Sequence, residues 1–115
     1  MLVLALLMVA SVGCTDLSET VTAPIEPSLT YTREIRPILE RSCVRCHGGE
    51  VTSLGYDLST YETAVDSVKN IIPGDPASRI LVKTARDGNM YRYLNSSRES
   101  EMIYTWVVRD GAARD

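Results

Sequence analysis

Hydrophobic residues recur with helical spacing in four stretches of this chain, and no stretch alternates convincingly with the two-residue period of a strand. The longest stretch spans about residues 33–47. Its stripe recurs at i, i+3, i+4, i+7, i+8 and i+11, at Ile35, Ile38, Leu39, Ser42, Cys43 and Cys46. This spacing predicts one face of a helix. Pro37 belongs in the first turn because it has no backbone N–H to donate, and Gly48 and Gly49 end the helix.

Two shorter helices are predicted next along the chain. Ser59 followed by Glu62 forms a capping box, in which each side chain bonds a backbone N–H near the other residue. This pair predicts a helix over about residues 60–69. After the breaking stretch "IIPGDP", Asp75 can cap a third helix that runs to about residue 86.

The fourth predicted helix spans about residues 97–110. Ser96 and Glu99 form a second capping box at its start, and Gly111 ends it. Its apolar face consists of Met102, Ile103, Trp106 and Val107. Short helices separated by substantial loops make a poor bundle on their own, but they suit a shell around a flat apolar group. The predicted fold class is therefore all-α.

The amino terminus has the pattern of an export signal. Residues 1–13 carry no charge and are too short to span a bilayer, as in the apolar core of a signal peptide. They end on small residues before Cys14, which resembles the processing site of lipoproteins, where the cysteine is lipidated and becomes the new N-terminus. The alternative is an ordinary secretory signal with Cys14 incidental. The small polar residues and prolines of residues 14–30 predict a flexible tether. The folded domain is predicted to span residues 31–115.

Length and charge narrow the classes of function. A chain of 115 residues forms one domain, and 12 basic against 15 acidic residues argue against a nucleic-acid binder. There is no Phe, so Tyr, Leu, Ile, Val and the single Trp must supply the core. A domain of this size buries roughly two-thirds of its unfolded surface and would gain from a large bound apolar cofactor.

The chemistry is concentrated in "RSCVRCHGG", residues 41–49. Two of the three cysteines and the only histidine lie here as Cys43, Cys46 and His47, the C-x-x-C-H signature of c-type haem attachment. Two thiols three positions apart can each add to a vinyl group on one edge of a porphyrin. His47 can then present an imidazole nitrogen to the iron, and the glycines that follow leave room for the ring. The sequence therefore predicts one haem c, bound covalently through Cys43 and Cys46.

Three other interpretations of the cluster are weaker. A structural zinc site closes four protein ligands, whereas this domain has one histidine and no second cysteine pair. A redox-active dithiol belongs at a helix N-terminus, where the dipole lowers the thiol pKa, but here the pair follows several apolar turns. A plain structural disulfide is the third. Export agrees with the haem interpretation, because c-type haem is attached outside the cytoplasm.

Most of the mature chain resembles the monohaem, class I-like cytochrome c domains of exported bacterial proteins, including planctomycete-type cytochrome modules. The stretches that carry the resemblance are "IRPILERSCVRCHGG", "YDLSTYETAV", "IIPGDPASRIL" and "MIYTWVVRDGAA". The resemblance implies a cytochrome c-like fold, with about four short helices wrapped around one haem and the first and last helices packed crosswise. It also implies that Trp106 faces the core or the haem edge.

Iron held by one histidine has a second axial position to fill. Met1 and Met8 lie in the predicted signal, and Met102 lies on the apolar face of the last helix, which leaves Met90 in a loop. In the resembled family the distal ligand is a Met in such a loop, so the resemblance implies Met90. Histidine and methionine together fill both axial positions and raise the reduction potential, which suits one-electron transfer.

The remaining candidates are secondary. The resemblance implies that the backbone carbonyl of Pro73 orients His47 through the second ring nitrogen. Tyr56, Arg79 and Trp106 are candidates for the haem edge or the propionates, with packing or a solvated surface as the alternative for each.

The sequence thus predicts an electron-transfer protein rather than an enzyme. It would be a monohaem cytochrome c on the periplasmic side of the cell membrane or outer membrane, anchored by lipid at Cys14. Its partner would be a redox protein or a respiratory or photosynthetic complex, and not nucleic acid. Two alternatives remain: a haem enzyme or gas sensor with a labile Met90 ligand, and a thiol–disulfide oxidoreductase without haem.

Overall fold

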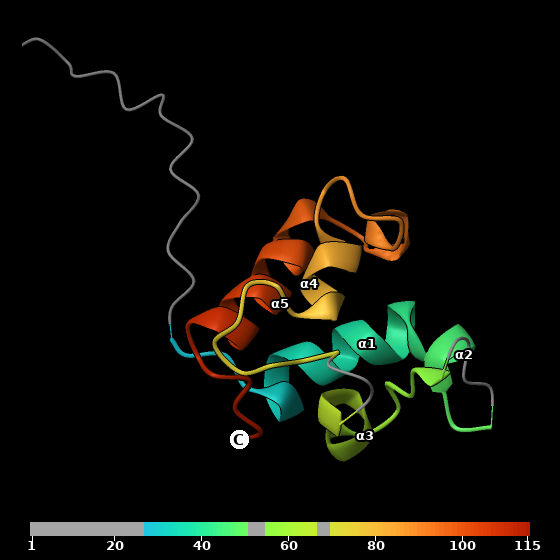
Figure 1. The fold of residues 1–115 in the computed structure, drawn as a ribbon, viewed down its shortest axis with the longest axis horizontal. Coiled ribbons are helices and arrows are strands. Elements are labelled where there is room, and N and C mark those ends of the chain that lie inside the picture. Colours follow the sequence, from blue (N-terminus) through green and yellow to red (C-terminus); the bar gives the residue numbers. More distant parts are fainter. Residues whose placement is uncertain (1–26, 51–54, 67–69) are drawn as a thin grey trace, which may run out of the picture.

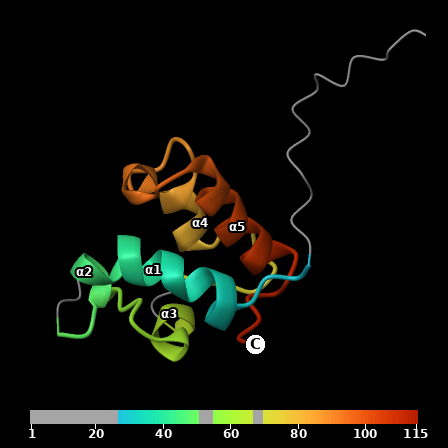
Figure 2. The same ribbon diagram turned by 180° about the vertical axis from the view of Figure 1, so that it is seen from behind.

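The computed structural model describes residues 27–50, 55–66 and 70–115, and the elements in these ranges are all helices (Figures 1 and 2). In chain order they are η1 (Tyr31–Ile35), α1 (Arg36–Ser42), α2 (Val44–His47), α3 (Tyr61–Asp66), α4 (Arg79–Thr84), η3 (Tyr91–Tyr93) and α5 (Ser97–Val108). The predicted all-α class is confirmed. No helix in the described ranges is both long and apolar enough to cross a membrane. The predicted signal, Cys14 and most of the predicted tether lie outside these ranges.

The helices form two groups, one made of η1, α1, α2 and α3 and the other made of α4 and α5. η1, α1 and α2 follow one another along a single line, with α3 on one side of it and the α4–α5 pair on the other (Figure 1). The rings of Tyr31 and Tyr61 meet edge to face, with centroids 5.3 Å apart, and so join η1 to α3. Arg41 of α1 pairs with Glu99 of α5 across the two groups.

Hydrogen bonds join the two ends of the domain to each other. The backbone N–H groups of Tyr31 and Thr32 donate to the carbonyl oxygens of Ala113 and Arg114, at 2.9 and 3.0 Å. The N–H of Leu29 donates to the Asp110 carboxylate at 2.9 Å. We call these two segments, residues 29–32 and 110–115, the terminal clasp. Because Leu29 is also buried in the core, the folded domain begins before Tyr31, the start that the sequence predicted.

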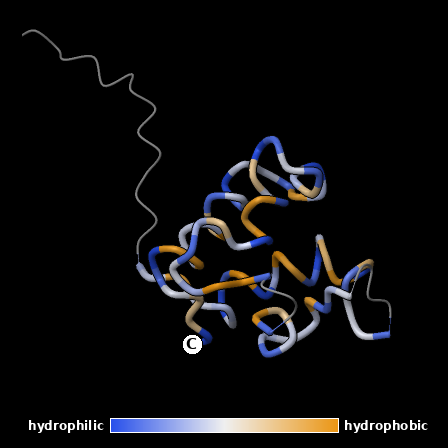
Figure 3. Tube along the Cα trace, viewed as in Figure 1, coloured by the Kyte–Doolittle hydropathy of each residue, from blue (hydrophilic) through white to orange (hydrophobic). Residues whose placement is uncertain are grey.

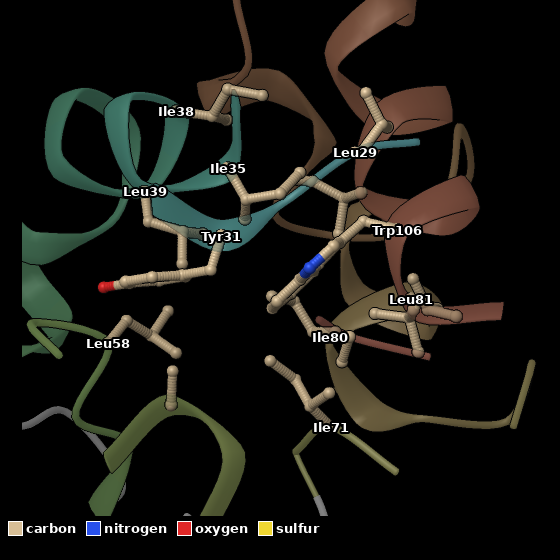
Figure 4. Close-up of a cluster of buried hydrophobic side chains, with 14 residues drawn as sticks. Leu29, Tyr31, Ile35, Ile38, Leu39, Leu58, Ile71, Ile80, Leu81 and Trp106 are labelled. Carbon is tan, nitrogen blue, oxygen red and sulfur yellow. The ribbon is translucent and has the colours of Figure 1, made fainter. Parts of the chain in front are cut away.

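The core lies between the two groups, beside the terminal clasp (Figure 4). Trp106 is completely buried there, its ring centroid lies 6.1 Å from that of Tyr31, and its Nε1 donates to the Ala113 carbonyl at 2.8 Å. A buried indole keeps its polar edge satisfied in this way. Ile35, Leu39, Ile103 and Val107 pack around it with no exposed surface. Figure 3 shows the loop between α4 and α5 as mostly hydrophilic, in contrast to the stretches that face the core.

The helix predicted over 33–47 is divided into three pieces. It begins as a wide π turn at Tyr31, where the Glu34 carboxylate accepts from the N–H of Thr30 at 2.7 Å. Pro37 lies in the first turn of the following α-helix, as predicted. Cys43 then leaves helical geometry, with φ −126° and ψ −40°, so α1 ends and α2 starts again at this residue. Gly48 ends α2, as predicted, and a Cβ there would lie 2.6 Å from the Val44 carbonyl oxygen.

The predicted capping boxes are replaced by other bonds. At α3 the pair is Thr60 and Thr63, whose side-chain oxygens accept from each other's N–H at 3.1 and 3.3 Å. The hydroxyl of Ser59 donates to the Asp57 carboxylate.

The other two predicted helix starts also differ. Asp75 caps only a turn, through the N–H of Ala77 at 2.8 Å, so α4 begins at Arg79. At α5 the side chain of Ser96 makes no capping bond, and Glu99 accepts instead from the N–H of Asn95 at 2.9 Å.

Candidate functional site

A cavity of about 250 Å³ lies between the α1–α2 segment and the α4–η3 segment. It is bordered by Cys43, Cys46, His47, Tyr56, Arg79 and Met90, all of which the sequence singled out. The cavity is partly open, and most of its wall is apolar. We call it the thiol cavity. It therefore brings the C-x-x-C-H residues together with a methionine from the opposite segment.

The two thiols have different surroundings. Cys43 sits at the break between α1 and α2, packs against the core and is half-buried, whereas Cys46 is exposed. Burial raises the pKa of the Cys43 thiol to about 11, and the nearby charge of Glu99 adds to the shift. Cys43 is therefore neutral at ordinary pH. Both cysteines are free thiols, so each remains available to form a bond with a ligand.

The His47 imidazole projects into the same cavity from the end of α2. Its Nδ1 atom is buried and has no hydrogen-bond partner among the described residues. The ring meets Tyr56 edge to face, with centroids 6.0 Å apart, and the chain after α2 returns so that the N–H of Leu58 donates to the His47 carbonyl. The backbone is thus fixed, whereas Nδ1 still lacks the bond that a buried polar atom normally makes.

Met90 reaches the cavity from the turn after α4. The turn is held to the helix end because the N–H of Met90 donates to the Lys83 carbonyl at 2.9 Å. Gly88 permits this close approach, since a Cβ there would lie 2.5 Å from the Val82 carbonyl oxygen. Met90 is the N-cap residue of η3. Met90 therefore lines the cavity from a short turn that a backbone hydrogen bond holds to the end of α4.

Tyr56 and Arg79 form one border of the cavity together. The Arg79 guanidinium lies over the Tyr56 ring, 4.9 Å from its centroid, and the same ring contacts His47. A cation over an aromatic face is attracted by the ring's electron density. This stack holds a positive charge at the rim.

Three residues considered from the sequence lie elsewhere. Pro73 is exposed and does not line the cavity, and His47 Nδ1 is not bonded to its carbonyl oxygen. Trp106 is fully buried in the core and its N–H is used by Ala113. Met102 packs against the core, as expected from the apolar face of its helix.

The cavity is also lined by residues that sequence reasoning did not assign to the site, among them Ser42, Asn70, Lys83 and Tyr93. The Ser42 hydroxyl oxygen is buried without a partner among the described residues. Asn70 is buried and donates from its side chain to the Ala64 carbonyl at 3.1 Å. Two of these had a signal in the sequence: Ser42 falls in the helical stripe with the cysteines, and Lys83 lies one turn after Arg79. Asn70 and Tyr93 had none.

The residues present suit a covalently held porphyrin. Two thiols could hold its edge, and an imidazole and a thioether are available as axial ligands. The unpartnered Nδ1 shows that the imidazole is not already engaged through this atom. A volume of about 250 Å³ lies just below the usual range of small-molecule sites, so a group as large as a porphyrin must widen the cavity or project from its open side. Within the described residues, no three His, Cys, Asp or Glu side chains are grouped so as to hold a metal ion.

Comparisons with protein-family models, with curated proteins and with solved structures found no match to this chain.

Proposed function

We propose that this chain is a monohaem c-type cytochrome with a cytochrome c-like fold that carries single electrons. The observation that carries the proposal is the thiol cavity, to which Cys43, Cys46, His47 and Met90 all contribute. Met90 is far from the other three in sequence, so chain proximity does not explain why it shares their cavity.

Each residue has a defined role in this proposal. Cys43 and Cys46 would hold the porphyrin through thioether bonds, and His47 and Met90 would ligate its iron through nitrogen and sulfur. Haem would supply an iron that gains and loses one electron. With both protein ligands bound, the iron would have no place for a substrate. The apolar walls, including Leu58 and Ile80, keep water from the ring.

The surroundings of the thiols favour haem attachment over thiol–disulfide exchange. An oxidoreductase needs a nucleophilic cysteine with a lowered thiol pKa. At Cys43 the pKa is raised to about 11 by burial. A neutral thiol, by contrast, can add across a vinyl group without an external oxidant, since sulfur bonds to one carbon and the proton goes to the other.

The cellular setting in this proposal rests on the sequence. Residues 1–13 direct export, lipid at Cys14 anchors the chain on the periplasmic side of the cell membrane or outer membrane, and residues 15–28 act as a tether. The anchor would keep the domain at high local concentration near a redox protein or a respiratory or photosynthetic complex.

The experiment is to produce the full chain in cells that attach haem c and to measure the intact mass and the visible spectrum. We expect the added mass of one haem and the spectrum of low-spin, sulfur-ligated ferric iron. The same mass shows whether Cys14 carries lipid. Replacing both Cys43 and Cys46 by Ala should abolish the covalent haem.

The matched pair Met90→Leu and Met102→Leu tests the distal ligand. Met90→Leu should remove the sulfur-ligated signature, lower the reduction potential and let carbon monoxide bind readily. Met102→Leu should leave all three unchanged, because Met102 packs against the core outside the cavity. High-spin iron that binds carbon monoxide in the unaltered protein would favour a haem enzyme or gas sensor. A colourless protein would exclude haem and leave the thiol–disulfide oxidoreductase.

A further inference from the structure

A second hollow lies beside α4, apart from the thiol cavity. It is an open groove of about 580 Å³ between α4, the turn that follows α4, and Tyr104 of α5. We call it the α4–α5 groove. Its apolar lining consists of Pro76, Leu81, Val82 and Ala85, together with the Tyr104 ring. Because only Lys83 and Asn89 line both hollows, the groove and the thiol cavity are separate sites.

The groove gathers exposed apolar side chains. Four large hydrophobic side chains are exposed in the described part of the chain, and two of them, Val82 and Tyr104, line this groove at 56% and 49% exposure. A single exposed hydrophobic residue needs no explanation, but several in one hollow mark a contact site. An open groove with an aromatic side chain suits an extended segment that contains proline.

The chain carries such a segment directly before the described domain. Residues 20–26 have the sequence "TVTAPIE", in which Val21 and Pro24 are three positions apart. Polyproline II has three residues per turn, so in that conformation the two side chains would share one face. A spacer that supplies only length needs no apolar side chains. The presence of Val21, Pro24 and Ile25 therefore favours a contact for this stretch.

The junction with the domain brings this stretch within reach of the groove. The N–H of Leu29 is bonded to Asp110, just after the end of α5 (Figure 1). Tyr104 lies six residues before Asp110, about 9 Å away at helical spacing. Five extended residues lead from Leu29 back to Pro24 and span up to about 16 Å. Pro24 can therefore reach Tyr104 if the chain folds back along α5.

Charge favours the same occupant. Residues 15–26 hold three carboxylates and no Lys or Arg. Lys83 and Asp87 line the groove, and Arg86 is exposed between them in the turn after α4. An acidic segment would thus meet two cations and one carboxylate, which makes its approach favourable.

We propose that residues 20–26 dock in the α4–α5 groove of their own chain. Docking leaves residues 15–19 as the free connection to Cys14. The reach from the anchor then falls from about 46 Å for the extended residues 15–28 to about 17 Å. With lipid at Cys14, as in the proposed function, docking holds the domain close to the membrane and limits which redox partners it can meet.

The first test is cleavage of the full chain by elastase, which cuts after small aliphatic residues such as Val21. A docked segment is cut only while it is open, so the rate reports the open fraction. A synthetic peptide of residues 17–27 gives the unprotected rate. We expect the full chain to be cut after Val21 about threefold more slowly than the peptide, with the products identified by mass.

Val82→Ser should bring the rate close to that of the peptide, because it removes an apolar contact from the groove. Ile72→Ser is the matched control. Ile72 is also an exposed aliphatic residue, at 37%, but it does not line the groove. Its substitution should leave the protection unchanged. Circular dichroism of both variants shows whether the helices are intact.

The second test keeps the groove unaltered. A photoreactive phenylalanine analogue replaces Ile25 in the full chain, and mass spectrometry locates the crosslink that forms on illumination. We expect crosslinks within one chain, to residues 81–89 or to Tyr104. Crosslinks between two chains would overturn docking within one chain and identify a second copy as the occupant.

Every other outcome also decides the proposal. A full chain cut as fast as the peptide overturns docking, and so does protection that survives Val82→Ser or is lost equally in Ile72→Ser. Crosslinks confined to other parts of the chain overturn it as well. Docking itself does not require haem, so both tests can be made on the haem-free chain. Their failure would leave the proposed cytochrome standing, and a chain without haem would leave docking standing.

Discussion

The core has one end at the terminal clasp and the other at the thiol cavity. The two ends differ in whether their buried polar atoms are hydrogen-bonded and in how closely their side chains pack. At the terminal clasp, the Trp106 N–H and the Tyr61 hydroxyl both donate to backbone carbonyls, at 2.8 and 2.9 Å, and the side chains around them are fully buried. At the thiol cavity, the Ser42 hydroxyl oxygen and His47 Nδ1 are buried with no partner among the described residues, next to about 250 Å³ of space.

This difference indicates which half folds on its own contacts. Close packing and satisfied hydrogen bonds contribute stability directly. Unpartnered polar atoms and unfilled volume subtract from it. The clasp half therefore stabilises the chain, while the cavity half has the properties of a region completed by a ligand. The predictions below address the haem-free chain, where the contrast should be largest.

The largest effect is expected from Trp106→Ala, which empties the centre of the clasp half. Removing a fully buried large side chain costs about 3–5 kcal/mol of unfolding free energy. This loss also frees the Ala113 carbonyl. Urea denaturation followed by circular dichroism measures it. Tyr104→Ala is the control on the same helix, because Tyr104 is 49% exposed and should change stability by about 0.5 kcal/mol or less. Equal losses for the two variants would contradict the contrast.

The parts of the structure that the sequence predicted are those encoded by neighbouring residues. The helical stripe correctly identifies the buried face at Ile35, Ile38 and Leu39, although its last member, Cys46, is exposed. Gly48 ends the segment as its lack of a side chain requires. The Cys43, Cys46 and His47 motif is local, so its members were found without knowing the fold. The apolar face of α5 likewise placed Ile103, Trp106 and Val107 in the core.

What the sequence did not predict depends on residues distant along the chain. The break at Cys43 divides a stripe whose period continues without interruption, so no local signal marks it. Leu29 belongs to the domain because Asp110 accepts its N–H across the clasp. Asn70 borders the cavity only because the chain folds back there, where its carbonyl accepts from the N–H of Ile80 at 3.0 Å. Met90 needed the family resemblance, since a loop methionine has no pattern of its own.

An intermediate effect is expected from pH, acting on the cavity half through Cys43. Burial raises the pKa of this thiol from 9.0 to about 11. Below about pH 9 the thiol is protonated in both the folded and unfolded haem-free chain, so stability there is unaffected by it. Between pH 9 and 11 only the unfolded chain loses the proton, so stability falls with rising pH, by about 2–3 kcal/mol in total.

Urea denaturation of the reduced, haem-free chain between pH 8 and 11 measures this slope. The control is Cys43→Ala, which keeps every other titrating group and should show a shallower decline. If Cys43→Ala and the unaltered chain lose stability in parallel, the thiol is not buried as the structure has it.

The smallest effect is expected from the contact that joins the two helix groups beside the cavity. Arg41 of α1 pairs with Glu99 of α5, and the side chains are 45% and 13% exposed. An ion pair whose arginine is open to water contributes about 0.2–1 kcal/mol and weakens with salt. Arg41→Gln should therefore cost less than Trp106→Ala by several-fold, and the cost should shrink in high salt. Arg36→Gln, which breaks a pair within α1, is the matched control for losing an arginine.

Arg41→Gln has a second consequence that Arg36→Gln lacks: it leaves the Glu99 charge unbalanced near Cys43, whose pKa that charge already raises. The alkaline loss of stability should still begin near pH 9.0, where the unfolded chain loses the Cys43 proton, but in Arg41→Gln alone it should extend to higher pH and become larger in total. An unchanged pH profile would show that the ion pair and the cavity thiol are independent.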